Sequence, residues 1–374
     1  MDFYEKALKQ ARQLKGKIEI TSKVKIETSQ DLATAYTPGV AAVSKNIAAD
    51  EKAVLELTGK GNNVAVVSDG TSVLGLGDIG PLAALPVIEG KCLLFKEFAG
   101  IDAFPIVLAT KDVNEIVATV KNIATSFGGV NLEDISAPHC FEVEERLQNI
   151  GIPVFHDDQH GTAIVILAAL TNALKVVGKK MSEIKVVILG SGAAGIATAK
   201  ILNPGKLVLI DSKGPVIKGR EDTNPYKEEA AGLKNYAPAS SVEEAFKGAD
   251  VFIGVSGRGS ISPDLVRLMS EDPIVFALSN PNPEIMPGAA KGAGAAVVAT
   301  GRSDFPNQIN NVLAFPGIFR GALDKRVPKI TAEMKIACAK ALADMITQPN
   351  PENILPSALD KDVVKNIRQA ILDS

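Results

Sequence analysis

The sequence has few cysteines, no long hydrophobic run and no concentration of charge of one sign. Its 374 residues include three cysteines, Cys92, Cys140 and Cys338, and none of them forms a Cys-x-x-Cys pair. This usage argues against a disulfide framework or a thiolate zinc site and fits a reducing compartment. The N-terminus has neither the basic region nor the apolar region of an export signal, so we expect a cytoplasmic protein.

The charges are balanced and dispersed along the chain. There are 40 basic and 43 acidic residues, and no polybasic run occurs. This balance argues against nucleic acid or an anionic membrane as the main partner. The longest apolar run near a predicted helix, residues 163–170, is too short to span a bilayer.

Apolar residues make up 46% of the chain, and its length is typical of two globular domains. Short apolar runs alternate with amphipathic stretches, which predicts two α/β domains with largely parallel sheets. We expect an N-terminal domain over residues 1–155, a nucleotide-binding domain with a doubly wound parallel sheet over 156–330, and a helical tail over 331–374.

A glycine-rich segment, Gly190-Ser191-Gly192-Ala193-Ala194-Gly195, follows a predicted strand and opens a predicted helix. This context is typical of a Rossmann dinucleotide site. The first glycine makes the turn, the second lets the backbone approach the pyrophosphate, and the third allows close packing of helix on strand. The helix N-terminus then binds the phosphates.

Asp211 ends the next predicted strand, about 20 residues further on, where an acid binds the ribose 2′-hydroxyl of NAD. Ser212 and Lys213 follow at once, with Lys218 and Arg220 nearby. These cations either receive the 2′-phosphate of NADP or belong to a solvated loop. The sequence therefore predicts NAD or NADP without choosing between them.

Two pairs of acids, Glu133-Asp134 and Asp157-Asp158, each follow an apolar strand and precede a loop. If the two strands are neighbours, the carboxylates converge, and oxygen ligands favour Mg²⁺ or Mn²⁺. Zinc is an alternative, because His156 and His160 are four residues apart, although this segment is predicted to be a loop. One of the acids could instead cap a helix.

Lys91 lies at the start of a predicted strand, Cys92–Phe95. It is either an edge lysine that reaches solvent or a base whose pKa is depressed by burial. Tyr36 precedes a predicted helix and is either a packing residue or a functional group. Sequence spacing alone does not decide between the structural and the functional interpretation of either residue.

The sequence resembles the short form of malic enzyme along essentially its whole length. Seven motifs carry the resemblance: Tyr36 to Ala41; Asp69-Gly70 with Leu74 to Gly80; Leu132 to Asp134; Asp157 to Ala163; Gly190 to Gly195; Leu278 to Pro281; and Asn310-Asn311 before Phe315-Pro316-Gly317. One position departs from the pattern. Larger family members have an arginine two residues after the Asp-Gly pair, where it grips a substrate carboxylate, and this chain has Ser72 there.

The resemblance implies oxidative decarboxylation of (S)-malate to pyruvate and CO₂, with NAD or NADP and with Mg²⁺ or Mn²⁺; oxaloacetate decarboxylation is a further expected activity. It also implies roles for individual residues. Lys91 would be the general base, Asp157 would tune it, and Tyr36 would protonate C3 of the enolate. The metal ligands would be Glu133, Asp134 and Asp158, while Asn280 and Asn311 would hold the substrate carboxylate and the nicotinamide.

Two other functions compete with this one. A metal-independent amino-acid dehydrogenase can have a similar two-domain plan, and a nucleotide-sensing protein can keep an inactive site. Retention of Lys91, Tyr36 and all three metal acids favours the enzyme. The family usually forms dimers or dimers of dimers, so we expect a homodimer in which Tyr36 could reach the partner's site.

Overall fold

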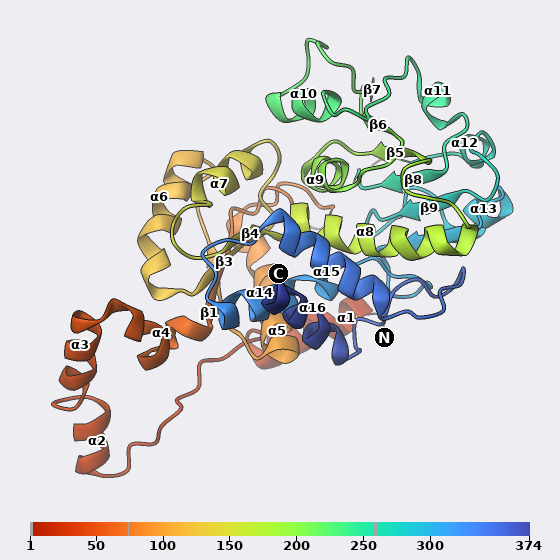
Figure 1. Ribbon diagram of the computed structural model, residues 1–374. Helices are drawn as coiled ribbons and strands as arrows, with labels where there is room; N and C mark the ends of the chain where they lie inside the picture. Colours follow the sequence, from red (N-terminus) through yellow and green to blue (C-terminus); the bar gives the residue numbers. More distant parts are fainter. Residues whose placement is uncertain (1–2, 74, 257–259) are drawn as a thin grey trace.

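The computed structural model describes residues 3–73, 75–256 and 260–374. Leu74, part of one motif above, lies outside this range. Two β-sheets stand side by side, with helices around and between them (Figure 1). The first sheet has the strand order β2-β1-β3-β4, and all its strands are parallel. Its strands are β1 (Asn63–Ser68), β2 (Asp102–Val107), β3 (Gly129–Leu132) and β4 (Val154–His156).

The second sheet has the order β10-β9-β8-β5-β6-β7, parallel except for the short last strand β7. Chain order runs outward from β5 first to one side and then to the other, which confirms the predicted doubly wound arrangement. Its strands are β5 (Lys185–Leu189), β6 (Lys206–Asp211), β7 (Gly214–Pro215), β8 (Val251–Gly254), β9 (Ile274–Ala277) and β10 (Val297–Thr300).

Both sheets are apolar on both faces, which is why their strands are continuous apolar runs. In β5, Val186 and Ile188 pack into the largest core, while Val187 packs into a separate core on the other face. In β1, Val64 and Val66 face that same largest core. One apolar core therefore extends along both sheets and joins the two halves of the molecule.

The helices between the sheets belong to this common core. Helix α8 (Asp157–Val177) contacts α9 and α15, and α14 contacts α16 and α5. The remaining helices are α5 (Pro81–Ala99), α6 (Val113–Ile123), α7 (His139–Leu147), α9 (Ala193–Ile201), α10 (Pro225–Ala231), α11 (Val242–Phe246), α12 (Pro263–Arg267), α13 (Pro287–Gly292), α14 (Phe315–Lys325), α15 (Ala332–Asp344) and α16 (Asp362–Asp373), with short 3₁₀ turns at Ala124–Ser126 and Asn311–Leu313.

Two local predictions were wrong. The expected strand Cys92–Phe95 is the second half of α5, whose buried residues Ala84, Ile88, Lys91, Cys92 and Phe95 recur at helical spacing. The expected loop at Asp157-Asp158 is the first turn of α8, where carboxylates are stabilised by the helix dipole.

Helix α8 is also long and apolar enough to cross a membrane by length and composition. However, 61% of its most apolar window is buried inside the protein, as expected for the core helix of a globular fold. It begins with two carboxylates and runs along the second sheet (Figure 1), packed against α9 and α15, so its composition is explained by packing.

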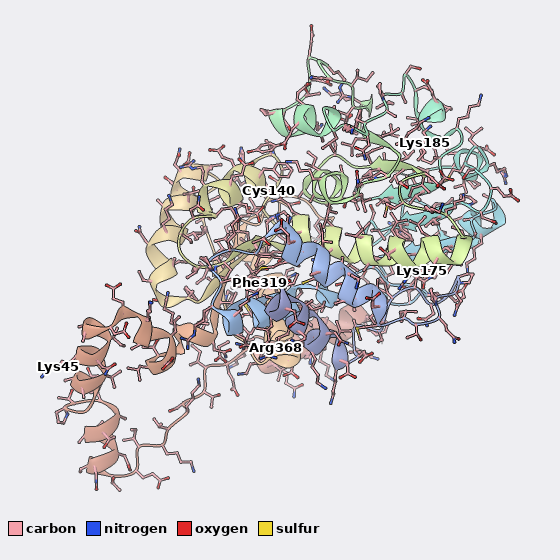
Figure 2. The ribbon with its side chains drawn as sticks, in the orientation of Figure 1. Lys45, Cys140, Lys175, Lys185, Phe319 and Arg368 are labelled. Atoms are coloured by element: carbon pink, nitrogen blue, oxygen red, sulfur yellow. The ribbon has the colours of Figure 1, made fainter. Side chains whose placement is uncertain are left out.

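The N-terminal helices form an arm that extends from the rest of the molecule (Figure 1). Neither α2 nor α3 has a buried residue. Figure 2 shows Lys45, on α3, at the far edge of the molecule, and Phe319 at its centre. The arm's helices and the first helix are α1 (Phe3–Leu14), α2 (Ser29–Ala35), α3 (Val40–Ala49) and α4 (Val54–Leu57), with 3₁₀ turns at Glu51–Ala53 and Gly59–Asn62.

Candidate active site

The two acid pairs meet because β3 and β4 are parallel neighbours, with Leu132 opposite His156. The next residues of each segment are Glu133 and Asp157, so both pairs leave the same edge of the sheet. Asp158 Oδ2 accepts a hydrogen bond of 2.8 Å from the backbone N–H of Asp134. Glu133, Asp134 and Asp158 each present a carboxylate oxygen within 4.8 Å of the others.

This cluster fits a hard divalent cation. Asp134 Oδ2 is buried without a hydrogen-bond partner, and three carboxylates so close together repel one another. Burial, followed by the charges of Asp158 and Glu133, raises the pKa of Asp134 to about 9. Burial also raises the pKa of Glu133 and that of Asp158. All ligands offered are oxygens, as Mg²⁺ and Mn²⁺ prefer.

The histidines do not form a zinc site with these acids. His160 Nε2 lies 2.9 Å from Glu144 Oε2, so its ring is engaged with α7. His156 is fully buried, with its Nε2 3.5 Å from Asp158 Oδ2. Within the described residues, the one cluster suited to a metal contains carboxylates only.

Lys91 projects from α5 into the acid cluster. Its amine lies 2.5 Å from Asp157 Oδ2 and 2.8 Å from Glu133 Oε1, and the side chain is 8% exposed. Phe315, from α14, places its ring centroid 4.1 Å from the same amine. The lysine is therefore held at the metal cluster by two carboxylates and an aromatic face.

One of the two interpretations of Lys91 supposed a pKa depressed by burial, but the pKa is raised. Burial would lower the pKa, but the negative charges of Asp157 and Glu133 outweigh burial and raise it. Burial in turn raises the pKa of Asp157 to about 8, against the opposing charge of Lys91. The two groups thus form a buried, tightly coupled pair, and the protonation of one depends on that of the other.

Several supporting residues were not identified from the sequence. Asn131 Nδ2 donates to Glu133 Oε2 at 2.8 Å; it precedes Glu133 by two residues, which places both on one face of the strand. Gly161 is required because a Cβ there would lie 1.8 Å from Asp157 Oδ1 and 3.2 Å from the Asn311 Cβ. Asn311 therefore lies beside the first turn of α8, next to Asp157.

The glycine-rich loop has the geometry of a dinucleotide site. Gly190 has φ +114°, and a Cβ there would meet the Val255 carbonyl at 2.6 Å, just past the ends of β5 and β8. A Cβ at Gly195 would lie 1.7 Å from the Gly190 carbonyl. Gly192 caps α9, and Ser191, Ala193 and Ala194 complete the turn at the helix N-terminus.

Asp211, at the end of β6, is surrounded by cations. Its Oδ2 accepts from Lys227 Nζ at 2.6 Å and from the Arg220 guanidinium, and its Oδ1 accepts from the Lys213 N–H at 3.0 Å. Burial would raise the pKa of Asp211, but these hydrogen bonds lower it to about 2. Ser212 and Lys213 are exposed beside it, and the acid and the cations share one surface.

Asn280 is exposed at the end of β9, where a Cβ at Gly75 would lie 2.3 Å from its carbonyl. A buried acid that sequence reasoning missed, Glu284, is 2% exposed and supports this loop. Its carboxylate accepts from the backbone N–H groups of Ser256 and Ser279, each at 3.2 Å. Glu284 thus ties the ends of β8 and β9 together.

Tyr36 is the one predicted catalytic residue that the fold does not bring to Lys91 within its own chain. It caps the C-terminal end of α2 on the arm, and it is 67% exposed. In Figure 1, α2 lies at the far end of the arm, whereas α5 lies in the body of the molecule.

The raised pKa values predict how Mg²⁺ affects stability. Asp134 ionises near 3.8 when unfolded and near 9 when folded, so between these values the folded apoprotein binds more protons and its stability falls as pH rises. The slope for one such group is about 1.4 kcal/mol per pH unit. We expect Mg²⁺ to raise the melting temperature more at pH 8.5 than at pH 6. Differential scanning fluorimetry with EDTA or Mg²⁺ measures this difference.

An Asp134→Asn variant supplies the control, because it should lose most of the pH-dependent part of the Mg²⁺ effect. An equal shift at both pH values in the unaltered protein would contradict the assignment of Asp134 as a ligand.

Comparison with known proteins identifies the family of this chain. The family description "Malic enzyme, NAD binding domain" matches residues 159–373, and "Malic enzyme, N-terminal domain" matches 15–115 and 109–148. A bifunctional malic/malolactic enzyme of Bacillus subtilis is 54% identical over 99% of this chain and 92% of its own. An NAD-dependent malic enzyme of Geobacillus stearothermophilus is 56% identical over 96% of this chain and 76% of its own.

The fold of this chain also agrees closely with that of a solved malic enzyme. The crystal structure of an NAD-dependent malic enzyme from Thermotoga maritima superposes with a TM-score of 0.94, at 48% identity and 98% coverage of both chains. An NADP-dependent malic enzyme of Halomonas elongata is 47% identical over 97% of this chain and 86% of its own. With its two sheets, its nucleotide loop and its acid cluster in the places described above, the chain belongs to the malic enzyme family.

Proposed function

We propose that the protein converts (S)-malate to pyruvate and CO₂ while reducing NAD or NADP, with Mg²⁺ or Mn²⁺ bound by Glu133, Asp134 and Asp158. The observation that carries the proposal is the position of Lys91, which contacts Asp157 and Glu133 beside the three-carboxylate cluster. A base, a metal site and a dinucleotide loop are the groups that this reaction needs. The protein should also decarboxylate oxaloacetate, because that reaction uses the same three-carboxylate cluster.

Removal of hydride from C2 of malate requires removal of the C2 hydroxyl proton. Lys91 is the proposed base, and its neutral form would accept that proton. Asp157, whose Oδ2 lies 2.5 Å from the Lys91 amine, would position and tune the base. The bound cation supplies Lewis acidity to the substrate oxygens. Asn280 and Asn311 would hold the substrate carboxylate and the nicotinamide, which would supply the hydride acceptor.

The decarboxylation then breaks the C3–C4 bond and leaves the enolate of pyruvate, whose C3 must take up a proton. Tyr36 is the proposed donor. Because Tyr36 is exposed on the arm of its own chain, we propose that the arm of one protomer delivers Tyr36 to the site of its partner in a homodimer. The exposed apolar side chains of the arm, among them Leu32 and Val40, support such an interface.

The assay uses purified protein with malate, Mn²⁺ and each cofactor, and it follows NAD(P)H and pyruvate together. We expect both products to appear in equal amounts and EDTA to stop the reaction. Absence of activity with both cofactors would overturn the proposal. Activity on an amino acid without metal would favour an amino-acid dehydrogenase, and tight cofactor binding without turnover would favour a nucleotide sensor.

We further propose that both cofactors bind, with Asp211 favouring NAD. The carboxylate can accept from the ribose hydroxyls, while Arg220 and Lys227 hold positive charge where a 2′-phosphate would lie. Replacing Asp211 by Ser frees both cations and removes the acceptor. We expect the ratio of kcat/KM for NADP over NAD to rise by roughly 10- to 100-fold, as for one or two charge-assisted hydrogen bonds.

An Asp264→Asn variant is the control, since Asp264 pairs with Arg267 on exposed α12 and should leave the ratio unchanged. A fall in the ratio for Asp211→Ser would show that the cations serve the carboxylate alone.

The remaining assignments concern the whole molecule. We propose that the protein is cytoplasmic and that its partners are small molecules, malate and pyruvate, with no nucleic acid and no membrane. We keep the division into residues 1–155, 156–330 and 331–374 as a proposal. Its middle part contains all six strands of the second sheet.

A further inference from the structure

A second cavity lies on the other side of α8 from the acid cluster. Its volume is about 330 Å³, within the range of small-molecule sites. Asp157 and Asp158 begin α8, and the helix turns by about 100° per residue, so Gln159 and Ala163 point away from the acids. These two residues line the cavity together with His160. The other walls come from α7, α9, α10 and α15.

Most of the cavity wall is apolar. Phe141 and Tyr226 contribute two rings whose centroids are 4.5 Å apart, and Ile196 and Ile336 add aliphatic surface from α9 and α15. Such a wall fits an apolar ligand of the size of one ring or one short branched chain.

Most polar groups of the cavity already have partners. Glu144 accepts from Gln159 Nε2 at 3.0 Å and from the His156 N–H at 3.2 Å, and it also contacts His160. Lys200 pairs with Glu229, and the Tyr226 hydroxyl donates to Glu145. None of these groups therefore needs a hydrogen bond or an ion pair from a ligand.

Lys335 is different. It lines the cavity from α15, and its amine lies 6.0 Å from the centroid of the Phe155 ring. Burial lowers the pKa of Lys335 to about 8 against the opposing charge of Glu144. Throughout the described ranges, 3–73, 75–256 and 260–374, no carboxylate lies within ion-pair distance of this amine, so a half-buried ammonium group lacks a direct partner.

We propose that this cavity binds a small apolar monocarboxylate, whose carboxylate pairs with Lys335 and whose body packs against Phe141, Ile196 and Tyr226. The site is separate from the acid cluster and does not depend on the proposed reaction. Its walls join α7 of the first half, α9 of the second half and α15 of the tail. A bound ligand would therefore hold these three parts and the first turn of α8 in one arrangement.

The test is a fluorine NMR titration of the full chain with 4-fluorobenzoate in EDTA, with 4-fluorobenzamide as the uncharged probe of the same shape. We expect saturable binding of the carboxylate, at least tenfold tighter than that of the amide. Lys335→Met should weaken 4-fluorobenzoate binding at least tenfold. Lys340→Met, on the same helix, should not, because Lys340 is exposed and lies beside Asp344.

A second variant tests the cavity independently, in case Lys335→Met does not fold. Ala332 is exposed at the edge of the cavity, and Ala332→Leu should narrow the entrance and weaken binding without touching the lysine. Equal affinity in all variants, equal affinity for the two probes, or displacement of 4-fluorobenzoate by malate with Mg²⁺ would overturn the proposal. Binding that persists with malate and Mg²⁺ present and is weakened by both variants would support it.

Discussion

An Asp158→Asn variant is expected to lose Mn²⁺-dependent turnover by about 10³-fold or more, while its affinity for NAD stays nearly unchanged. The amide removes one of three anionic ligands, and it also replaces an oxygen that accepts from the Asp134 N–H at 2.8 Å. The nucleotide loop begins at Gly190, after β5 of the second sheet, whereas Asp158 follows β4 of the first sheet. Steady-state rates across a range of Mn²⁺ concentrations, with NAD binding measured by calorimetry, test both parts.

Glu183→Gln is the matched control, because it replaces a carboxylate by an amide at an exposed acid that pairs with Lys180. Its turnover should equal that of the unaltered protein. Full Mn²⁺-dependent activity in Asp158→Asn would remove this residue from the ligand set, and a parallel loss of NAD affinity would point to general damage to the fold.

Mixing two inactive variants is expected to restore activity if Tyr36 acts across the dimer. Lys91→Ala lacks the base and should lose most of kcat, while Tyr36→Phe should still oxidise malate but stall at protonation of the enolate. After subunit exchange, half of the dimers contain one chain of each kind, and one of their two sites has both residues. The mixture should therefore regain about a quarter of the normal rate of pyruvate formation.

The control mixture pairs Lys91→Ala with Asp158→Asn. Both changes affect groups that one chain brings together, so every site in a mixed dimer stays defective and no activity should return. Differently tagged chains verify that exchange has occurred. If exchange is complete and the Tyr36→Phe mixture remains inactive, Tyr36 acts within its own chain or not at all.

The metal cluster could be predicted from sequence because it depends on local features repeated at two places. Each acid pair follows a short apolar run, and a parallel sheet brings the ends of neighbouring strands to one edge. The glycine-rich loop is predictable for a similar reason, since the strand, turn and helix are contiguous. In both cases the functional residues directly follow the strands that position them, so their placement can be predicted from the neighbouring sequence.

Other features depend on distant parts of the chain. The run Cys92–Phe95 could be a strand or a buried helix, and only packing against Phe315 and Phe319 from α14 decides for the helix. The pKa of Lys91 depends on Asp157 and Glu133, which are 66 and 42 residues away in sequence. Glu284 could not be found because its partners, Ser256 and Ser279, follow two separate strands.

The position of α8 has a consequence for attempts to divide the protein. Glu133 and Asp134 follow β3 of the first sheet, whereas Asp158 begins a helix whose length packs against α9 of the second half and α15 of the tail. A fragment that ends before α8 would keep two ligands, and one that starts at α8 would keep one. Independently produced halves should therefore bind Mg²⁺ weakly, and tight binding would report that the halves have reassembled.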